Sequence, residues 1–267
     1  MTVTKKAYAK INLTLEILGT RRGDGFHDIA SVMHKVESLY DEVTVARTPS
    51  GIAFVCDADV CPPDKNLAYR AAAGYFERCT EKGVPAGSGV SISLKKKIPA
   101  QAGLAGGSSD AAAVLAALDE LYGALDETEL SALALSLGSD VPFCFHKSLC
   151  ALCTGRGEKI APLPPMRQVS VVVRFPDAPL STAGIYAEYD RLYGDDYTKE
   201  KSVHMARTLE RGGSFEELAQ NLCNDFQALC ERRCPAIAET RARLAAQGYV
   251  SQMTGSGSAV FGLMPAR

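Results

Sequence analysis

The sequence has almost no net charge of either sign. Lys and Arg total 29 against 31 Asp and Glu, which gives a formal net charge of -2. A nucleic-acid backbone or an anionic membrane surface attracts a basic protein, so this balance argues against both as partners. No run of about 18 apolar residues is present, so no membrane-spanning helix is predicted. The N-terminus also has no apolar signal core, and we therefore expect a cytoplasmic protein.

The cysteines lack the pairing that would indicate a metal site or a disulfide framework. There are nine of them, an odd number, between Cys56 and Cys234. Cys150 and Cys153 form a Cys-x-x-Cys pair, but no second pair or suitably spaced histidine completes a zinc site. We expect reduced thiols, many of them packed as small hydrophobic side chains. Whether this pair has a role beyond packing stays open.

Length and composition indicate an ordinary globular protein with one large domain or two modest ones. The chain has 267 residues, of which 46% are hydrophobic and 22% charged. Prolines interrupt the chain at 162–165, which predicts an N-terminal domain over 1–163 and a C-terminal domain over 164–267. Helical and strand patterns are mixed and no internal repeat is evident. The predicted fold class is α+β.

Hydrophobic periodicity predicts the elements. Residues 7–18 alternate as a strand with one face on a core, and Lys10 and Asn12 lie on its polar face. Residues 43–45 and 52–55, separated by Thr-Pro-Ser-Gly, are predicted to pair as a hairpin. Further strands are predicted over 90–94, 169–175, 249–253 and 258–263. Helices are predicted over 66–78, after the loop at 99–109, over 126–138, 185–192 and 235–247, and from a cap at Ser214.

The most informative segment is a glycine-rich loop that leads into a helix. It consists of Pro99, Ala100, Gln101, Ala102, Gly103, Leu104, Ala105, Gly106, Gly107, Ser108 and Ser109. Glycine allows backbone N–H groups to approach phosphate oxygens, and a helix start adds free donors and partial positive charge. The serine hydroxyls can donate to a phosphate or coordinate a magnesium ion bound to it. The loop matches neither a P-loop nor a dinucleotide fingerprint, and a simple packing turn stays open as the alternative.

Phosphoryl transfer to a hydroxyl needs a base and a cation near that loop. Asp140 is a candidate base, because Pro142 is expected to keep Val141 out of a helix and leave Asp140 on a turn. Lys10 is a candidate cation. Taken alone, each has a more ordinary interpretation, as a turn former and as a solvated strand lysine. The triplet at 95–97 is likewise expected to be a solvated strand end.

Several motifs together resemble the GHMP small-molecule kinase superfamily from about residue 7 to residue 263. In chain order they are Ala-Lys-Ile-Asn-Leu (9–13), Gly-Phe-His (25–27), the glycine-rich loop with Asp-Ala-Ala (103–112), Leu-Gly-Ser-Asp-Val-Pro (137–142), Thr-Gly-Arg-Gly-Glu (154–158) and Thr-Gly-Ser-Gly-Ser-Ala-Val-Phe (254–261). The first, second and fifth of these resemble the member that acts on 4-diphosphocytidyl-2-C-methyl-D-erythritol.

This resemblance implies a two-domain α+β fold with the active site in the cleft between the domains. The N-terminal domain would contain a left-handed β-α-β unit and the C-terminal domain would be ferredoxin-like. The implied activity is transfer of the γ-phosphoryl group of ATP to the C2 hydroxyl of that substrate, in the non-mevalonate route to isoprenoids. ATP would be the co-substrate with Mg²⁺, whose ligands stay unassigned. A monomer or a homodimer is expected, with neither nucleic acid nor membrane as partner.

The resemblance also implies individual roles. Asp140 would take the proton of the attacking hydroxyl, and Lys10 would hold that carboxylate ionised and offset charge at the acceptor oxygen. Residues 99–109 would bind the ATP phosphates and Asn66 would line the adenine pocket. The residues implied in binding the second substrate are Asn12, Phe26, His27 and Tyr186.

Two departures and two alternatives accompany this interpretation. Phe26 stands where the family usually has tyrosine, so stacking on cytosine is kept and a hydroxyl contact is lost. Ala105 replaces a common glycine, and we expect a negative φ there. The turn over 254–258 is expected to brace the loop. The alternatives are another GHMP kinase, with mevalonate or a sugar as acceptor, and a nucleotide-binding module without catalysis.

Overall fold

The computed structural model describes residues 1–21, 25–83, 89–176, 180–193 and 200–266. The chain divides into two compact units. The first contains residues 1–9, 36–100 and 105–147, and the second contains residues 10–35, 101–104 and 148–267. Both units are assembled from separate stretches of chain, and the domain boundary between residues 163 and 164 stays a prediction.

The sheet of the first unit has the strand order β4-β5-β3, and β1 also pairs with β3. These strands are β1 (Thr2–Asn12), β3 (His27–Thr48), β4 (Ile52–Cys56) and β5 (Gly89–Lys95). The predicted hairpin between β3 and β4 is wrong, because β5 lies between them, antiparallel to β3 and parallel to β4. Helix α1 (Leu67–Glu81) follows β4 and supplies the crossover that a parallel pair needs.

Two helices of the first unit, α1 and α3, begin at residues whose side chains cap them. The 3-10 turn η1 (Pro63–Lys65) precedes α1, whose N-cap Asn66 accepts from the backbone of Ala68. Helix α2 is Gly106–Tyr122 and α4 is Val141–Phe145. Helix α3 (Glu127–Leu137) starts at a capping box between Asp126 and Glu129. The predicted helices over 66–78 and 126–138 are confirmed.

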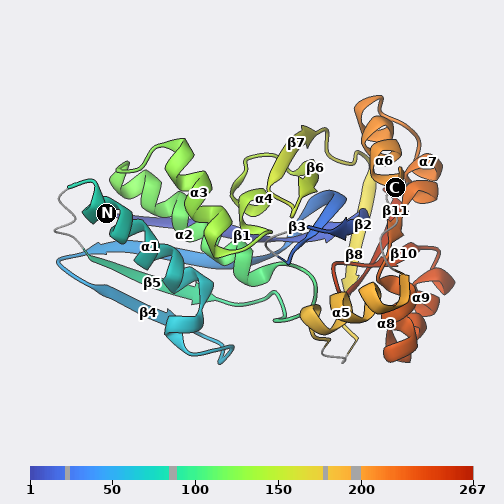
Figure 1. The fold of residues 1–267 in the computed structure, drawn as a ribbon, viewed down its shortest axis with the longest axis horizontal. Coiled ribbons are helices and arrows are strands. Elements are labelled where there is room, and N and C mark those ends of the chain that lie inside the picture. Colours follow the sequence, from blue (N-terminus) through green and yellow to red (C-terminus); the bar gives the residue numbers. More distant parts are fainter. Residues whose placement is uncertain (22–24, 84–88, 177–179, 194–199, 267) are drawn as a thin grey trace. The chain divides into compact units, whose positions relative to one another are not determined.

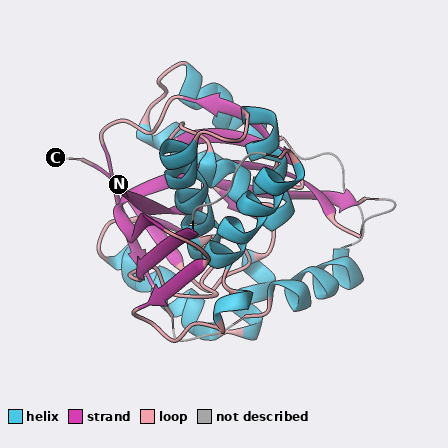
Figure 2. Ribbon diagram, turned by 90° about the vertical axis from the view of Figure 1, so that its left-hand side faces the viewer, coloured by secondary structure: helices cyan, strands magenta, loops and turns pink. Residues whose placement is uncertain are grey.

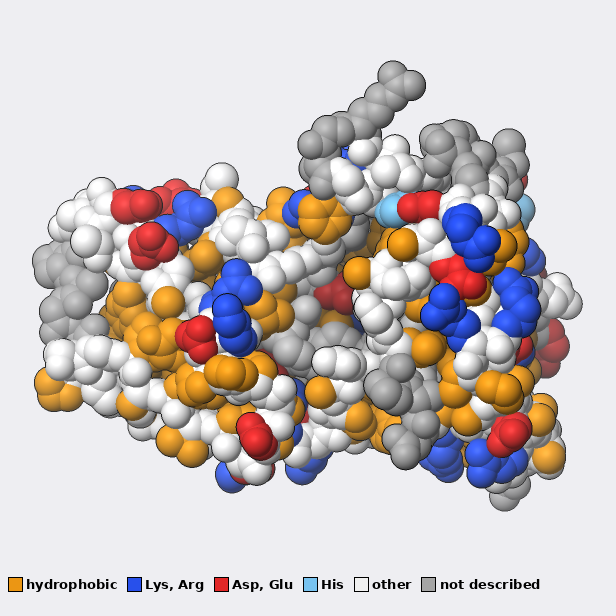
Figure 3. Space-filling view, turned by 60° about the horizontal axis from the view of Figure 1, so that its bottom comes forward, with side chains coloured by type: hydrophobic (Ala, Val, Ile, Leu, Met, Phe, Trp, Pro, Cys, Tyr) orange, Lys and Arg blue, Asp and Glu red, His pale blue; other side chains and the backbone are white. Residues whose placement is uncertain are grey.

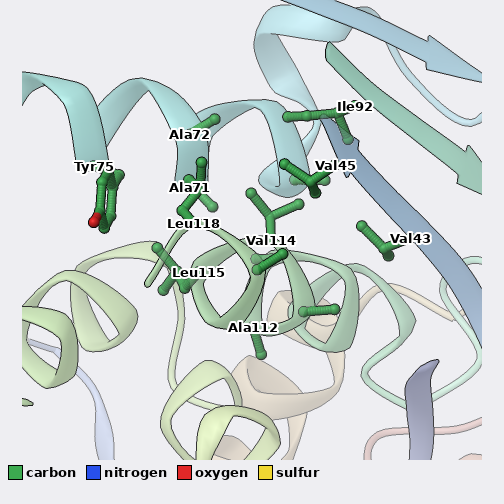
Figure 4. Close-up of a cluster of buried hydrophobic side chains, with 14 of the residues drawn as sticks. Val43, Val45, Ala71, Ala72, Tyr75, Ile92, Ala112, Val114, Leu115 and Leu118 are labelled. Atoms are coloured by element: carbon green, nitrogen blue, oxygen red, sulfur yellow. The ribbon is translucent and has the colours of Figure 1, made fainter. Parts of the chain in front are cut away.

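The core of the first unit lies between these helices and one face of the sheet (Figures 1 and 2). Val43 and Val45 of β3 point to the same face because side chains alternate along a strand. They meet Ile92 of β5 and side chains from α1 and α2 in the close-up of Figure 4. Tyr75 of α1 and Leu115 of α2 are among the largest fully buried side chains. This packing holds α2, and therefore its glycine-rich N-terminus, on a rigid base.

The second unit contains two sets of strands. Strand β3 pairs with β2 (Thr14–Thr20) and with β6 (Cys150–Gly155), and β6 pairs with β7 (Lys159–Leu163). Strand β2 also pairs in parallel with the short β9 (Cys223–Asn224). A separate antiparallel sheet has the order β10-β11-β8, formed by Val250–Met253, Val260–Pro265 and Val169–Arg174. The predicted terminal hairpin and the strand over 169–175 are confirmed.

Five described helices belong to the second unit. Three of them match predictions: α5 (Thr182–Tyr193), α7 (Phe215–Asn221), which starts at the Ser214–Glu217 capping box, and α9 (Pro235–Ala246). Helices α6 (Lys201–Glu210) and α8 (Gln227–Arg233) were not predicted.

The predicted strand over 7–18 is interrupted at Leu13, where β1 ends and β2 begins. Its polar face is buried, since Lys10, Asn12 and Glu16 are all 3% exposed or less. The Glu16 carboxylate explains part of this, because it accepts from the backbone N–H groups of Lys201 and Ser202 at 2.9 and 2.7 Å. It therefore binds the N-terminus of α6, where a negative charge is favourable.

Acidic and basic side chains are interspersed on the face drawn in Figure 3. Within the described residues, no helix is both long and apolar enough to cross a membrane. Cys150 and Cys153 are both fully buried on β6. Burial raises the pKa of Cys150 to about 12, which keeps this thiol protonated at neutral pH.

Candidate active site

The first half of the glycine-rich loop packs against the turn between β10 and β11. The backbone N–H of Ala259 donates to the carbonyl of Ala102 at 3.1 Å. Gly103 has a φ of 76°, and a side chain there would begin 2.3 Å from the carbonyl oxygen of Thr254. Only glycine fits this position. The expected contact between the loop and the 254–258 turn is confirmed.

Ala105 contradicts its prediction, because its φ is 55° and lies in the left-handed region. It is the N-cap of α2, and the chain needs this conformation to turn from the loop into the helix. The methyl group makes that conformation costly for alanine but not for glycine, by about 1 kcal/mol.

The N-terminus of α2 has the properties of an anion site. Ala105 provides no side-chain cap, and the first N–H groups of a helix have no partner within it. Gly107 is exposed and Ser108 is half-buried. Ser109 is buried and its hydroxyl donates to the carbonyl of Tyr8 at 2.6 Å. Of the two serines, Ser108 is thus the better candidate to meet a phosphate.

Lys10 lies against the same loop. Its ammonium group donates to the carbonyl of Gly103 at 3.1 Å and to the side-chain oxygen of Asn12 at 2.7 Å. Its backbone N–H donates to the carbonyl of Leu104 at 3.0 Å. A buried cation is thus held at the glycine-rich loop rather than in solvent.

Asn12 is held by groups of the protein. Its side-chain oxygen accepts from the Thr254 hydroxyl at 3.1 Å and from the Gly255 backbone at 3.0 Å, in addition to Lys10. Its amide nitrogen donates to the Ser31 hydroxyl at 2.8 Å. Asn12 therefore connects Lys10 to the turn that braces the loop, a function that its strand position alone did not indicate.

Asp140 lies on the turn between α3 and α4, as predicted, and α4 begins directly after it. It is the N-cap of this short helix, with α-helical φ and ψ, and Val141 and Pro142 form its first turn. The prediction that Pro142 excludes a helix is wrong, because proline is well tolerated at the first positions of a helix. Helix α4 packs on α2, and the sulfur of Cys144 lies 3.2 Å from the Ser109 hydroxyl. Asp140 is half-buried and belongs to the first unit, whereas Lys10 belongs to the second.

His27 and Tyr186, both predicted to bind substrate, lie together in the second unit. Their ring centroids are 4.7 Å apart, and the ring of Tyr186 also lies 4.6 Å from that of the buried Phe226. The imidazole Nε2 lies 2.7 Å from a carboxylate oxygen of Asp190, one helical turn after Tyr186 on α5. Asp190 was not predicted from the sequence. Its position four residues after Tyr186 places both side chains on the same face of α5, and this spacing could have indicated it.

Phe26 is exposed by 46% and its ring is covered on one side by the guanidinium group of Arg156, 4.2 Å from the ring centroid. Arg156 occupies the turn between β6 and β7, where its backbone N–H donates to the Glu158 carboxylate at 2.6 Å. The Thr-Gly-Arg-Gly-Glu motif thus presents a cation to Phe26.

Asn66, predicted to line the adenine pocket, is 6% exposed and its side chain caps α1. The cap contributes about 1 kcal/mol to stability. Asn66 is placed near the glycine-rich loop by the residue that follows it, Leu67. A side chain on Gly107 would begin 3.6 Å from the Leu67 side chain.

A buried ion cluster beneath the loop was missed. Lys96 donates to the carboxylates of Asp41 and Asp110, at 2.5 and 2.6 Å, and its side chain is 9% exposed. The expectation that the 95–97 triplet is a solvated strand end is therefore wrong for Lys96. Burial raises the pKa of Asp110 to about 7, against the opposing charge of Lys96. The second oxygen of Asp110 is buried and has no hydrogen-bond partner in the described structure.

The comparisons with known proteins agree with this geometry. The family model for the GHMP kinases N terminal domain matches residues 66–148, and that for the GHMP kinases C terminal matches residues 205–267. A 4-diphosphocytidyl-2-C-methyl-D-erythritol kinase from Symbiobacterium thermophilum is 41% identical over 271 residues, covering 98% of this chain and 90% of the relative.

Solved structures give the same result. A crystal structure of 4-(cytidine 5'-diphospho)-2C-methyl-D-erythritol kinase matches with a TM-score of 0.78 and 35% identity, covering 99% of this chain and 91% of that one. A crystal structure of L. major mevalonate kinase matches with a TM-score of 0.69 at 17% identity, covering 98% of this chain and 88% of that one, which is a likeness of fold alone. The chain has the α+β GHMP kinase fold, it belongs to the GHMP kinases, and within them it groups with the 4-diphosphocytidyl-2-C-methyl-D-erythritol kinases.

Proposed function

We propose that the protein transfers the γ-phosphoryl group of ATP to the C2 hydroxyl of 4-diphosphocytidyl-2-C-methyl-D-erythritol, a step of the non-mevalonate route to isoprenoid precursors. The observation that carries this proposal is the buried Lys10 ammonium on the carbonyl of Gly103, in a chain 41% identical to such a kinase. A cation at the glycine-rich loop is what a transferring phosphoryl group requires.

Residues 99–109 are proposed to hold the ATP phosphates. The support is the uncapped start of α2 and the exposure of Gly107, which leave backbone donors open to an anion. Ser108 would add a hydroxyl donor, whereas Ser109 is engaged with Tyr8. Asn66 is proposed to act at the adenine end through the start of α1, which it caps.

Asp140 is proposed to accept the proton of the C2 hydroxyl as that oxygen attacks the γ-phosphorus. A positioned general base contributes about 10²–10⁴ in rate. Lys10 is proposed to offset the negative charge at the acceptor oxygen and to keep the carboxylate ionised. Phosphoryl transfer leaves little covalent work to the protein, so the placement of these two charges supplies most of the catalysis.

Magnesium would accompany ATP. Within the described ranges, no group of three or more His, Cys, Asp or Glu side chains could hold a metal ion. This fits an ion whose ligands are mainly phosphate oxygens and water, the common arrangement for magnesium at nucleotide sites. When bound, it would neutralise charge on the β- and γ-phosphates. We assign it no protein ligand.

The cytosine ring is proposed to bind at Phe26, His27 and Tyr186. The support is the exposure of Phe26, the contact of its ring with Arg156, and the contact between His27 and Tyr186. Aromatic faces contribute about 1–3 kcal/mol per stacked base in single-strand binders, which sets the scale here. Asn12 keeps its proposed place near the substrate, acting through its hold on Lys10.

Finer predictions accompany this function. They are the left-handed β-α-β unit, the ferredoxin-like C-terminal domain, the active site in a cleft between domains, the cytoplasmic location and the choice between monomer and homodimer.

Steady-state turnover of ATP tests the proposal. ADP formation is measured with 4-diphosphocytidyl-2-C-methyl-D-erythritol, with mevalonate and with a free sugar as acceptor. We expect turnover with the first alone. Turnover confined to mevalonate or to the sugar would indicate a different GHMP kinase, and ATP binding without turnover of any acceptor would indicate a non-catalytic module.

A further inference from the structure

The imidazole of His27 is held at one nitrogen only. Its Nε2 lies 2.7 Å from Asp190 and 3.3 Å from the Thr20 hydroxyl. The described residues make no hydrogen bond to Nδ1. The His27 side chain is 8% exposed, whereas that of Asp190 is 44% exposed. The carboxylate thus reaches a nearly buried ring from the solvent side of α5.

This geometry decides which nitrogen carries the proton. An ionised carboxylate only accepts hydrogen bonds, so Nε2 must donate to Asp190. In the neutral ring Nδ1 is then the acceptor, because only one nitrogen of neutral imidazole carries a proton. Without Asp190 the Thr20 hydroxyl can donate or accept, and either tautomer satisfies it.

Neighbouring rings hold the imidazole in place. Tyr186 packs on it with an interplanar angle of 43°, and Tyr186 in turn contacts the fully buried Phe226 edge-on. Tyr186 and Asp190 lie one turn apart on α5, so the helix supplies both the stacking contact and the hydrogen bond. The orientation of the ring and its proton are therefore set by a single element.

We propose that Asp190 is a positioning residue that fixes the proton of His27 on Nε2, so that Nδ1 accepts a hydrogen bond from the exocyclic amino group of the nucleobase. This inference rests on the proposed function, in which His27 contacts cytosine. Cytosine carries an amino donor at position 4, whereas uracil carries a carbonyl acceptor there. An acceptor at Nδ1 therefore selects a cytidine diphosphate over a uridine diphosphate substrate.

Substrate selectivity provides the first test. The kcat and KM of full-length protein are measured with 4-diphosphocytidyl-2-C-methyl-D-erythritol and with its uridine analogue. For Asp190→Ala we expect the preference for the cytidine substrate to fall by about tenfold or more, through KM, with kcat within about threefold. Asp190→Glu, whose carboxylate also only accepts, restores the preference at least in part. An equal change in KM for both substrates would overturn the inference.

The matched control is Asp28→Asn. Asp28 adjoins His27 in the chain, is exposed, and faces Arg21 at 3.7 Å. This substitution removes the same charge at a side chain that does not contact the imidazole. We therefore expect the variant to keep the parental preference for the cytidine substrate over its uridine analogue. If Asp190→Ala does not fold, Asp190→Asn takes its place, because an amide can donate or accept and no longer fixes the proton.

Nitrogen NMR of the substrate-free protein provides a second test that does not depend on turnover. The chain has four histidines, and the His27 signals are identified by their loss in His27→Gln. We expect the Nε2–H tautomer in the parent and a mixture in Asp190→Ala. A parent His27 protonated on Nδ1 alone would overturn the inference even if the kinase is active. Conversely, absence of kinase activity with the Nε2–H tautomer present would refute the proposed function and leave the proton assignment standing.

Discussion

The ammonium group of Lys10 and the side-chain oxygen of Asn12, two residues apart on one face of β1, lie 2.7 Å from each other in a buried setting. The same oxygen accepts from Thr254 and Gly255. A charge is costly to bury unless it is hydrogen-bonded, and Asn12 together with the Gly103 carbonyl meets that requirement. These two hydrogen bonds hold the Lys10 ammonium group in place.

Replacing Lys10 by methionine should abolish most activity without unfolding the protein. Asn12 keeps its two remaining donors, so its oxygen stays satisfied. We expect kcat to fall by about 10²–10³-fold, as for other preorganised donors, and the circular-dichroism spectrum to stay unchanged. Lys95→Met, at a side chain 65% exposed, is the control and should keep full activity. A Lys10→Met protein with near-parental kcat would remove Lys10 from the mechanism.

Asp140→Asn tests the proposed base. The amide keeps the size of the side chain and cannot accept the proton, so we expect kcat to fall by about 10²–10⁴-fold while ATP binding is retained. Single-turnover kinetics and titration with a fluorescent ATP analogue separate the two effects. The exposed Asp64→Asn serves as the matched control. A rate within a few-fold of the parent would exclude Asp140 as the base.

Ala105→Gly should stabilise the protein. The φ of 55° costs alanine about 1–2 kcal/mol, and the greater backbone entropy of glycine in the unfolded chain cancels part of the gain. We expect the free energy of unfolding in urea to rise by about 0.5–1 kcal/mol. Ala132→Gly, at an exposed position within α3, should lower it by about 1 kcal/mol instead. Destabilisation by both substitutions would contradict the left-handed conformation at residue 105.

Asp110 should make stability depend on pH. Its pKa is raised from 3.8 to about 7, chiefly by burial, so the folded protein holds a proton that the unfolded chain has lost. This contribution to stability is complete below the unfolded value and disappears as the pH rises through about 7. Over that window the free energy of unfolding should fall by at most about 1.4 kcal/mol per pH unit.

The comparison variant is Asp110→Asn, measured by urea unfolding between about pH 5 and pH 8. It should show a flatter profile, whereas the exposed Asp64→Asn should keep the parental slope. Equal slopes in all three proteins would exclude Asp110 as the source.

Removing the Glu16 carboxylate should destabilise the second unit. Glu16→Ala leaves the N–H groups of Lys201 and Ser202 without their acceptor at a helix start, at a cost of about 2 kcal/mol. Thermal unfolding measures the loss. Glu37→Ala, at an exposed position of β3, should change the midpoint little. If the two variants unfold at the same midpoint temperature, the contact of Glu16 with α6 contributes nothing to stability.

Local patterns predicted local structure well. Asp126 with Glu129 and Ser214 with Glu217 are capping boxes in the structure as in the sequence, because a cap depends on residues three positions apart. The hairpin between β3 and β4 failed for the opposite reason. Both segments are strands, but their pairing depends on β5, which comes more than thirty residues later.

In the candidate site too, features within one continuous segment were predictable and contacts between distant segments were not. The glycine-rich loop and its helix were predictable, since both lie in one continuous segment. The triplet at 95–97 looks uniform in sequence, yet Lys95 is exposed and Lys96 is buried. Its partners Asp41 and Asp110 come from distant strand and helix positions, which no local pattern can indicate. The same holds for Asp190, which is far from His27 in the chain.

The central place of β5 affects how the first unit is assembled during synthesis. Strand β4 emerges from the ribosome before β5, the strand with which it pairs in the described structure, because β5 comes later in the chain. Until residue 95 is made, the edge of β3 that pairs with β5 in the folded protein lacks its partner. Strand β4 could then pair with this edge incorrectly. Such edges promote non-native pairing and aggregation. A nascent chain that stalls between residues 56 and 89 is therefore the form of this protein most in need of a chaperone.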